Sequence, residues 1–248
     1  MMRDRILSAR RLLLAMIVAV AFTVVQAQTC TPTATFSYTD AEGNPVEEKN
    51  TTFSGSAPVT GHFAAVPSEL GSYVGNYTWH VYASDKNWND YIITRSGEEF
   101  EYTFVQSGSY IVELRATFTD PNGLTVDYPE EGTAPATFTV TVSESKLEMP
   151  NAFSPNGDGK NDIYRAKQSS LQSIVEFKAT IFNRWGQKLY QWTDPRGGWD
   201  GRYNGKTVKD GVYFVNVVAK GADGVEYKIR KDVNVLTRYT ENEGDTDN

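Results

Sequence analysis

The sequence predicts an all-β protein of two tandem Ig-like β-sandwich domains that follow a cleaved signal peptide. Short runs with period-two alternation recur along the chain, rich in Val, Thr, Tyr and Phe and separated by Gly, Asn and Asp. Such runs indicate strands joined by turns, and helix-type periodicity is scarce beyond the leader. The charged stretch SESKLE, residues 143–148, divides the runs into two sets. We therefore expect two antiparallel β domains, residues 28–145 and 146–240.

The first 27 residues have the pattern of a secretory signal peptide. Four arginines lie within the first 11 residues, residues 12–25 are almost continuously apolar, and Val25-Gln26-Ala27 offers a cleavage site after Ala27. The apolar run is about 14 residues, which is short for a membrane span. The mature chain is expected to have no span.

The mature chain is acidic. The leader holds 4 of the 24 basic and 1 of the 31 acidic residues, which leaves 20 against 30 and a net charge of −10. This balance argues against nucleic acid and anionic lipid as main partners. The only cysteine, Cys30, allows no internal disulfide framework. Residues 241–248, ENEGDTDN, are expected to be a disordered acidic tail.

The first domain holds about seven candidate strands, the number found in an Ig-like sandwich. The clearest runs are Ala34–Tyr38, Tyr77–Tyr82, Phe100–Val105, Tyr110–Thr117 and Ala136–Val142. Residues 101–112, EYTFVQSGSYIV, together with Trp79, resemble the signature of PKD-like domains. The family's W-x-F-G-D-G turn is absent, because His80-Val81-Tyr82-Ala83-Ser84-Asp85 follows Trp79. The resemblance implies an Ig/PKD-like sandwich.

The second domain carries several glycine- and asparagine-rich motifs among its strands. Its runs are Phe177–Phe182, Gln187–Gln191, Val212–Ala219 and Val225–Val235. The motif FNRWGQ, residues 182–187, places Asn and Gly between two runs and predicts a hairpin. In WDG, residues 199–201, an aromatic residue stands two positions before a glycine that can adopt positive φ.

In order and spacing, MPNAFSPNGDGKND, FNRWG, WDG and GVYF resemble the type B C-terminal sorting domain of the Bacteroidetes type IX secretion system, the gliding-motility-associated family. The resemblance covers residues 147–239. The added acidic tail, and Asp232 where the family commonly has Gly, depart from its pattern. The resemblance implies a sorting surface around residues 153–162, 184–186 and 199–201. The motif residues are Pro150, Asn151, Phe153, Ser154, Pro155, Asn156, Gly157, Asp158, Gly159, Asn161, Asp162, Asn183, Arg184, Trp185, Gly186, Trp199, Asp200, Gly201, Gly211 and Tyr213.

The loop at residues 156–162 has two interpretations. Asn156, Asp158 and Asp162 are the oxygen-bearing residue types of a calcium loop. Lys160 stands within the loop, however, and no Glu closes it at the EF-hand distance. The alternative is an Asx-rich turn in which these side chains accept hydrogen bonds from backbone amides. The turn is the interpretation we favour, with no cofactor expected.

Catalytic patterns are scarce in the sequence. The two histidines are His62 and His80, and neither a Gly-x-Ser-x-Gly elbow nor a His-Glu-x-x-His pair occurs. Neighbouring glutamates such as Glu98 and Glu99 point to opposite faces of a strand. We expect that the protein is not an enzyme. Trp88 and Tyr91 lie in an aromatic loop, and an exposed Trp88 ring would suit ligand contact, although aromatic residues also fill sandwich cores.

The expected function follows from the resemblance. Export by Sec to the periplasm would be followed by recognition at outer-membrane type IX translocon components, and then by residence at the cell surface or outer membrane, or by secretion. The passenger is a single Ig-like domain without a catalytic set. This favours a small secretion-associated or signalling component, with a periplasmic or membrane signalling receptor as a further partner. The alternative is an adhesin-like binding module carried as cargo.

Overall fold

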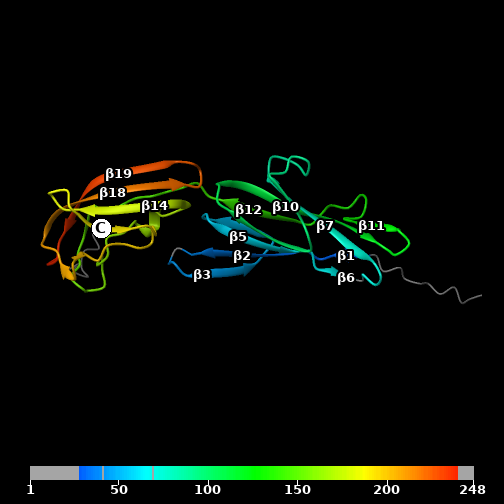
Figure 1. The fold of residues 1–248 in the computed structure, drawn as a ribbon, viewed down its shortest axis with the longest axis horizontal. Helices are drawn as coiled ribbons and strands as arrows, with labels where there is room; N and C mark the ends of the chain where they lie inside the picture. Colours follow the sequence, from blue (N-terminus) through cyan, green and yellow to red (C-terminus); the bar gives the residue numbers. More distant parts are fainter. Residues whose placement is uncertain (1–27, 41, 69, 240–248) are drawn as a thin grey trace, which may run out of the picture.

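The computed structural model describes residues 28–40, 42–68 and 70–239 and shows an all-β protein (Figure 1). The expected signal peptide and acidic tail lie outside the described residues. The only helical element among the described residues is the 3-10 helix η1, Gln168–Ser170. The all-β prediction is confirmed, and the predicted runs correspond to strands whose ends differ by a few residues.

The strands form two sets that pack around separate cores. The first set, which we call the N-terminal unit, is β1 Thr29–Cys30, β2 Thr33–Thr39, β3 Pro45–Lys49, β4 Thr52–Gly55, β5 Val59–Ala64, β6 Pro67–Ser68, β7 Val74–Ala83, β8 Ile93–Ser96, β9 Glu99–Phe104, β10 Gly108–Thr119, β11 Thr125–Tyr128 and β12 Thr137–Val142. The second set, the C-terminal unit, is β13 Ala152–Phe153, β14 Ile174–Phe182, β15 Lys188–Trp192, β16 Arg202–Tyr203, β17 Lys206–Thr207, β18 Gly211–Gly221 and β19 Glu226–Val235.

The N-terminal unit is a sandwich of two sheets. One has the order β4-β12-β10-β7-β8, with β11 also paired to β10, and the other has the order β3-β2-β5-β9. Alternate side chains of both sheets point inward, as the alternating burial of β5 and β12 shows. Trp79 is fully buried at the centre, and its indole Nε1 donates a hydrogen bond to the Gly97 carbonyl oxygen at 3.1 Å. The buried tryptophan and the edge pairing of β4 parallel to β12 are typical of an Ig-like sandwich.

The C-terminal unit has one large sheet, in the order β13-β19-β18-β14-β15. Its inner face is covered by irregular segments, by η1 and by the small β16–β17 pair rather than by a second extended sheet. The covering segments, about residues 154–173 and 193–210, are rich in Gly, Asn and Asp, which favour turns over strands. As in the N-terminal unit, a short parallel edge strand precedes three long antiparallel strands.

A tyrosine hydroxyl closes the turn before a central strand in each unit. Tyr110 donates to the Gln106 carbonyl oxygen at 3.0 Å, and Tyr213 donates to the Lys209 carbonyl oxygen at 2.9 Å. Both tyrosines follow a glycine by two residues, at the start of β10 and of β18. This contact to the backbone four residues upstream is the tyrosine corner of Ig-type sandwiches.

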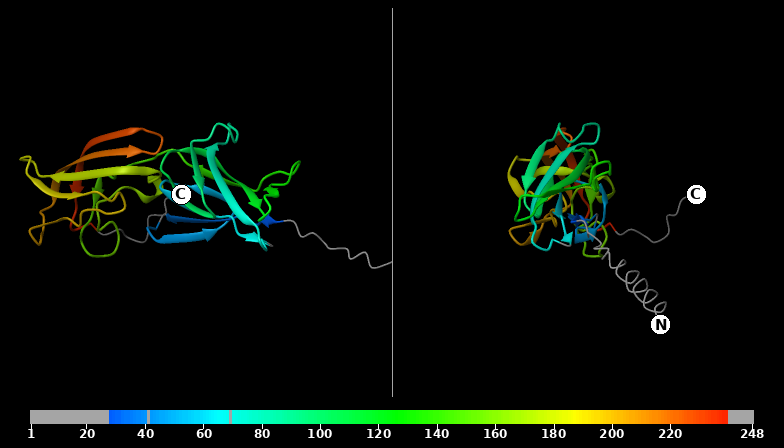
Figure 2. Two further views of the ribbon diagram at one scale, coloured as in Figure 1. Left: turned by 45° about the vertical axis from the view of Figure 1, so that its right-hand side comes forward. Right: turned by 90° about the vertical axis from the view of Figure 1, so that its right-hand side faces the viewer.

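The two units lie end to end (Figures 1 and 2). Hydrogen bonds hold them together. Ser173 is buried at the junction, where its Oγ accepts from the Ala57 amide at 3.1 Å and lies 3.1 Å from Ser143 Oγ. The Ser107 amide donates to the Ala222 carbonyl oxygen at 3.0 Å, and Ala222 packs into the core of the N-terminal unit. The junction is therefore a packed interface.

The stretch between the units is part of that interface rather than a free tether. The Asp223 carboxylate accepts from the Ser145 amide at 2.8 Å and from its hydroxyl at 2.7 Å. Lys146 and Gln172 exchange two backbone hydrogen bonds of 2.9 Å. A Cβ on Gly221 would lie 2.1 Å from Ser145 Oγ, so only glycine fits there. Residues 145–147 thus form a strap fixed to the C-terminal unit.

We expect each tyrosine corner to stabilise its unit by about 1 kcal/mol, because a Tyr→Phe change leaves the acceptor carbonyl without its partner. Tyr110→Phe and Tyr213→Phe should each lower the melting temperature by roughly 2–4 °C. Their effects on the free energy of unfolding should add, because the two sites lie in separate units. Tyr91→Phe, in a half-exposed ring, is the control for loss of a hydroxyl, and equal melting of all three variants would contradict the assignment.

The strap should make stability depend on pH through Asp223. Burial acts to raise the pKa of this carboxyl, but the hydrogen bonds from Ser145 outweigh it, and the pKa lies below its usual range. A depressed pKa in the folded state adds stability above the unfolded value of about 3.9, and this stability is lost as pH falls through the folded value. Asp223→Asn should cost about 1 kcal/mol at pH 7 and flatten the loss of melting temperature below about pH 4. Asp232→Asn, at an exposed position far from the strap, is the control and should leave the fall of melting temperature at acid pH as in the native chain. The same fall in both variants would refute the assignment.

Candidate functional site

The loop after β13 is an Asx-rich turn held by its own side chains. The Asp162 carboxylate accepts hydrogen bonds from the Gly157 amide at 2.6 Å and the Gly159 amide at 2.8 Å. Asn156 Oδ1 accepts from the Asp158 amide at 2.9 Å, and Asp158 accepts from the Lys160 amide at 2.8 Å. The oxygens that could ligate calcium thus bind backbone amides of the same loop.

Hydrogen bonds within this loop also stabilise the ionised form of Asp158. The Lys160 amide, then the Asn156 side chain, holds the pKa of the Asp158 carboxyl below its usual range. Across the part of the chain that the structure describes, no group of three or more His, Cys, Asp and Glu side chains is placed to hold a metal ion. These contacts favour the structural-turn interpretation over the calcium interpretation.

Several motif residues expected on a contact surface lie in the core instead. Trp199 is fully buried, with ring centroids 5.4 Å from Phe153 and 5.6 Å from Tyr213, and its Nε1 donates to the Arg202 carbonyl oxygen at 2.8 Å. Gly201 has φ 75°, and a Cβ there would lie 2.7 Å from Pro155 Cγ. The expectation that residues 199–201 form a sorting surface is wrong for Trp199 and Gly201, because the irregular segments need these residues to cover the sheet.

The other motif residues near β13 and β18 mostly shape the backbone. The Pro150 carbonyl oxygen accepts from Tyr164, the Asn151 carbonyl oxygen accepts from the Asn234 amide, and the buried Ser154 donates its amide to the Asn161 carbonyl oxygen. Gly211 begins β18 and Tyr213 is its tyrosine corner. Asp200 is exposed and accepts from the Arg202 amide at 3.0 Å.

The hairpin between β14 and β15 presents its motif residues to solvent. Asn183 Oδ1 accepts from the amides of Trp185 and Gln187, each at 3.0 Å, which fixes the turn predicted from FNRWGQ. Trp185 is 78% exposed at the tip, with the Arg184 guanidinium carbon 4.8 Å from the centroid of its ring. Arg184, Trp185 and Gly186 are therefore the motif residues best placed for contact with another molecule.

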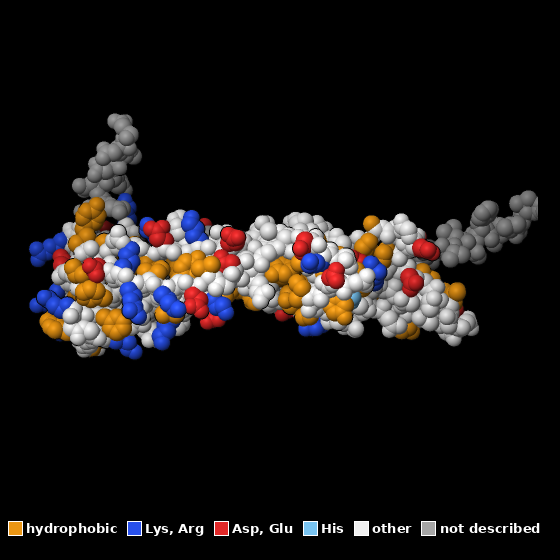
Figure 3. All heavy atoms as spheres, turned by 90° about the horizontal axis from the view of Figure 1, so that it is seen from above, with side chains coloured by type: hydrophobic (Ala, Val, Ile, Leu, Met, Phe, Trp, Pro, Cys, Tyr) orange, Lys and Arg blue, Asp and Glu red, His pale blue; other side chains and the backbone are white. Residues whose placement is uncertain are grey.

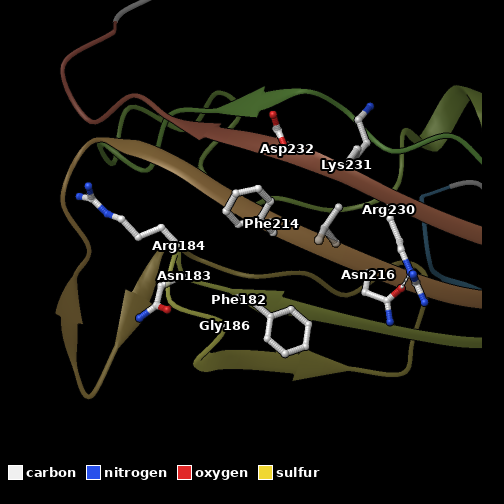
Figure 4. A pocket seen from close by; sticks show the side chains of 10 residues that line it. Phe182, Asn183, Arg184, Gly186, Phe214, Asn216, Arg230, Lys231 and Asp232 are labelled. Carbon is white, nitrogen blue, oxygen red and sulfur yellow. Dashed lines mark hydrogen bonds between the residues drawn. The ribbon is translucent and has the colours of Figure 1, made fainter.

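Beside this hairpin lies a shallow groove of about 460 Å³ that the sequence motifs did not predict (Figure 4). Phe182, Phe214, Asn216 and Arg230 line it, together with Arg184 and Asp232. The sequence signal was GVYFVNVVA, residues 211–219, which is apolar at both parities rather than alternating. A continuous apolar run indicates a strand with apolar residues on both faces.

The loop of the N-terminal unit that carries Trp88 and Tyr91 is packed onto its sheet. The Trp88 ring stacks on His80 at 3.7 Å, and the Arg115 guanidinium carbon lies 4.2 Å from the ring centroid. His80 Nδ1 lies 2.8 Å from the Trp88 carbonyl oxygen. Trp88 is only partly exposed, because its ring packs against His80 and Arg115, and the expectation of a freely exposed ring is wrong. Tyr91 remains 47% exposed.

Under this loop lies a buried polar network. Glu113 is 4% exposed and accepts from Tyr82 at 2.7 Å and from Arg115 Nε at 3.0 Å. Burial, and then the hydrogen bond to Glu113, raise the pKa of Tyr82 far above its usual range. Each of these polar groups has a partner, so the network supports a structural role.

Substitutions of exposed Trp185 and buried Trp199 should distinguish a surface residue from a residue that the fold requires. Trp199→Ala should destabilise the protein by about 3–5 kcal/mol, because it empties a core site. Trp185→Ala should change the free energy of unfolding by no more than about 0.5 kcal/mol, because the ring is exposed. Denaturant unfolding of both variants measures this, and a comparable loss in Trp185→Ala would contradict the assignment of its ring to the surface.

Residues 147–229 match the CHU_C Type IX secretion signal domain. No curated protein matches the chain. Among the described residues, no helix is long and apolar enough to cross a membrane.

Three solved structures illustrate a distant likeness. A tetra-tandem repeat in the extending region of a large adhesion protein has 12% identity and a TM-score of 0.26, with 84% of this chain and 68% of that chain covered. Fibronectin(III)-like modules of Clostridium thermocellum CbhA have 15% identity and a TM-score of 0.22, with 77% and 92% covered. Bacteroides ovatus SGBP-B in complex with a mixed-linkage heptasaccharide has 16% identity and a TM-score of 0.21, with 75% and 42% covered.

Those scores are too low to carry an argument, and the Ig-like assignment rests on the sheets, the buried tryptophan and the tyrosine corners. The family match is different, because it falls on the C-terminal unit and includes every motif from the loop after β13 to β18. Residues 147–229 are thus similar to a type IX secretion signal domain, which supports the sorting-domain prediction and implies export to the cell surface or secretion.

Proposed function

We propose that the chain is a non-enzymatic exported protein of Bacteroidetes, and that its C-terminal unit directs it to the type IX secretion system. It acts as a small secretion-associated or signalling component through protein–protein contact. The observation that carries the proposal is the match at residues 147–229 on a unit with its own core. The matched unit supplies a sorting surface without any chemistry of its own.

The expected route begins with the signal peptide and Sec export to the periplasm. Outer-membrane type IX translocon components then bind the C-terminal unit, and the product resides at the cell surface or outer membrane, or is secreted. A periplasmic or membrane signalling receptor is the further partner that this role implies. The layout of an Ig-like unit before a sorting unit is similar to that of the small secretion-associated protein PorA.

The N-terminal unit supports a component role over a catalytic one. Among the residues that the structure describes, His62 lies 3.6 Å from Glu99 on the exposed outer face of its sheet, and His80 stacks on Trp88 and makes a tilted contact with Tyr91. Their ring nitrogens lie beside the Glu99 carboxylate and the Trp88 carbonyl oxygen rather than beside a serine, threonine or cysteine. Such an arrangement serves packing and surface charge rather than nucleophilic catalysis.

The second candidate is an adhesin-like cargo module, favoured by the exposed Tyr91 and Ile92 at the edge of the packed loop. Stacking of a sugar on Trp88 is disfavoured, because His80 and Arg115 already cover its ring. The exposed rim is better suited to protein contact than to stacking.

Removing residues 147–248 should stop the N-terminal unit from reaching the cell surface or the medium. Fractionation and immunodetection of both forms measure this, with solubility of the truncated form in the periplasm as its folding control. Surface delivery of the truncated form would refute the sorting role. Deleting the whole gene separates the two candidates: a component's loss reduces secretion of other type IX cargoes, and a cargo's loss leaves them unchanged.

A further inference from the structure

The charge of the mature chain is divided between its two units. Residues 147–239 hold 15 Lys and Arg against 10 Asp and Glu, a net charge of +5. Residues 28–146 hold 5 against 16, a net charge of −11. On the face of the molecule in Figure 3, lysines and arginines gather over the C-terminal unit and are few over the N-terminal unit. An overall acidic protein thus carries a cationic sorting unit.

The large sheet of the C-terminal unit has one open face. Val215, Val217 and Ala219 of β18 point into the core, and the alternate residues of the strand point outward. No strand or helix among the described residues packs on that outer side. Open sheet faces normally carry polar side chains, but here Phe214 is 41% and Val218 50% exposed.

Strand register places these apolar residues among cations. Val218 is paired with Lys178 on one side and Lys228 on the other. In the next cross-strand row of the same face, Asn216 lies between Thr180 and Arg230. Arg230 Nε donates to Asn216 Oδ1 at 3.4 Å.

The row after that is Phe182–Phe214–Asp232, and its two phenylalanines form the apolar floor of the groove beside Arg184 (Figure 4). The acidic residues Glu176, Glu226 and Asp232 lie at the borders of the face, and Lys228 already pairs with Glu226 at 2.8 Å.

We infer that this open face docks an acidic polypeptide segment that carries large apolar side chains. The inference rests on the proposed function, because it names the surface through which the sorting unit is bound and the chemistry of the partner. Carboxylates would pair with Lys178, Lys228 and Arg230, and apolar side chains would cover Phe182 and Phe214.

A short peptide segment suits the face better than an extended polyanion. Nucleic acid or an anionic bilayer would also meet the N-terminal unit, which lies end to end with the sheet and carries −11. The resulting repulsion acts over a Debye length of about 8 Å at physiological salt. A second copy docked face to face would place Lys178 and Lys228 against like charges. The chain's own tail is acidic but has no apolar residue for the aromatic floor.

The binding experiment uses the full mature chain and a fluorescein-labelled synthetic heptapeptide of alternating Glu with Phe or Leu. The triple variant Lys178→Glu, Lys228→Glu, Arg230→Glu should weaken its binding at least about tenfold, as should raising salt from about 50 to about 500 mM. The matched control Arg202→Glu, Lys206→Glu, Lys209→Glu makes the same charge change on the loop side and should leave affinity unchanged. Thermal unfolding checks that both variants fold.

Two further measurements test whether binding depends on the charge of the peptide and on the apolar floor of the groove. A peptide with Lys in place of Glu should bind the triple variant and not the native chain. Phe182→Ser with Phe214→Ser should weaken the acidic peptide at least about fivefold without altering charge. Equal binding by the face and control variants, or no binding by the native chain, would overturn the inference. A chain ending at Tyr239 that binds the peptide over tenfold more tightly would overturn it in favour of the tail as occupant.

Export in cells separates this inference from the proposed function. If the face variant stays in the periplasm while the loop control reaches the surface, both stand. If the face variant is exported normally while deletion of residues 147–248 blocks export, the sorting role stands and the docking face is refuted. If the deletion is exported as well, the sorting role itself is refuted.

Discussion

The C-terminal unit is shaped by the need to bury one face of a single five-stranded sheet without a second large sheet to cover it. A covering layer made of loops cannot supply ladders of backbone hydrogen bonds, so it needs side chains that accept from amides and turns that bring the backbone close. Asp162 and Asn156 serve the first need, and Gly201 against Pro155 serves the second. Trp199 fills the space under the layer. The motif residues are therefore mostly the means by which loops replace a sheet.

The need to bury one face of the sheet also decides which residues are accessible to a binding partner and which are not. A motif whose members are buried is required for folding, and a change in it acts by destabilising the unit. The outer side of the sheet needs no particular side chain for stability, so apolar and cationic residues there are available for contact. Phe214 and Val218 would be replaced by polar residues at little cost to the core, because each is 40–50% exposed. This is why the tests above compare exposed and buried members of one unit.

Much of the fold could be predicted from the sequence, because period-two alternation and Gly–Asn turns are local signals. FNRWGQ, residues 182–187, predicted a hairpin, and Asn183 fixes its turn by accepting from the Trp185 and Gln187 amides. What stayed hidden was decided by contacts distant in sequence. Trp88 was expected to be exposed because its neighbours are polar, but Arg115, 27 positions later, covers it. Trp199 was expected at a surface because the family resemblance implied a sorting surface at residues 199–201, but its ring is buried in the core.

The strap between the units affects which partners can reach the C-terminal unit. Three contacts fix the relative position of the N-terminal unit, with its charge of −11, and the C-terminal unit, with its charge of +5. They are the hydrogen bond from Ser145 to Asp223, the hydrogen bond from the Ala57 amide to Ser173, and the packing of Ala222 in the N-terminal core. A fixed acidic neighbour limits which anionic partners can approach the cationic sheet, because a large polyanion must meet both units at once. A small acidic segment meets only the sheet. Separating the units would therefore alter selectivity as well as stability, even if every side chain of the open face were kept.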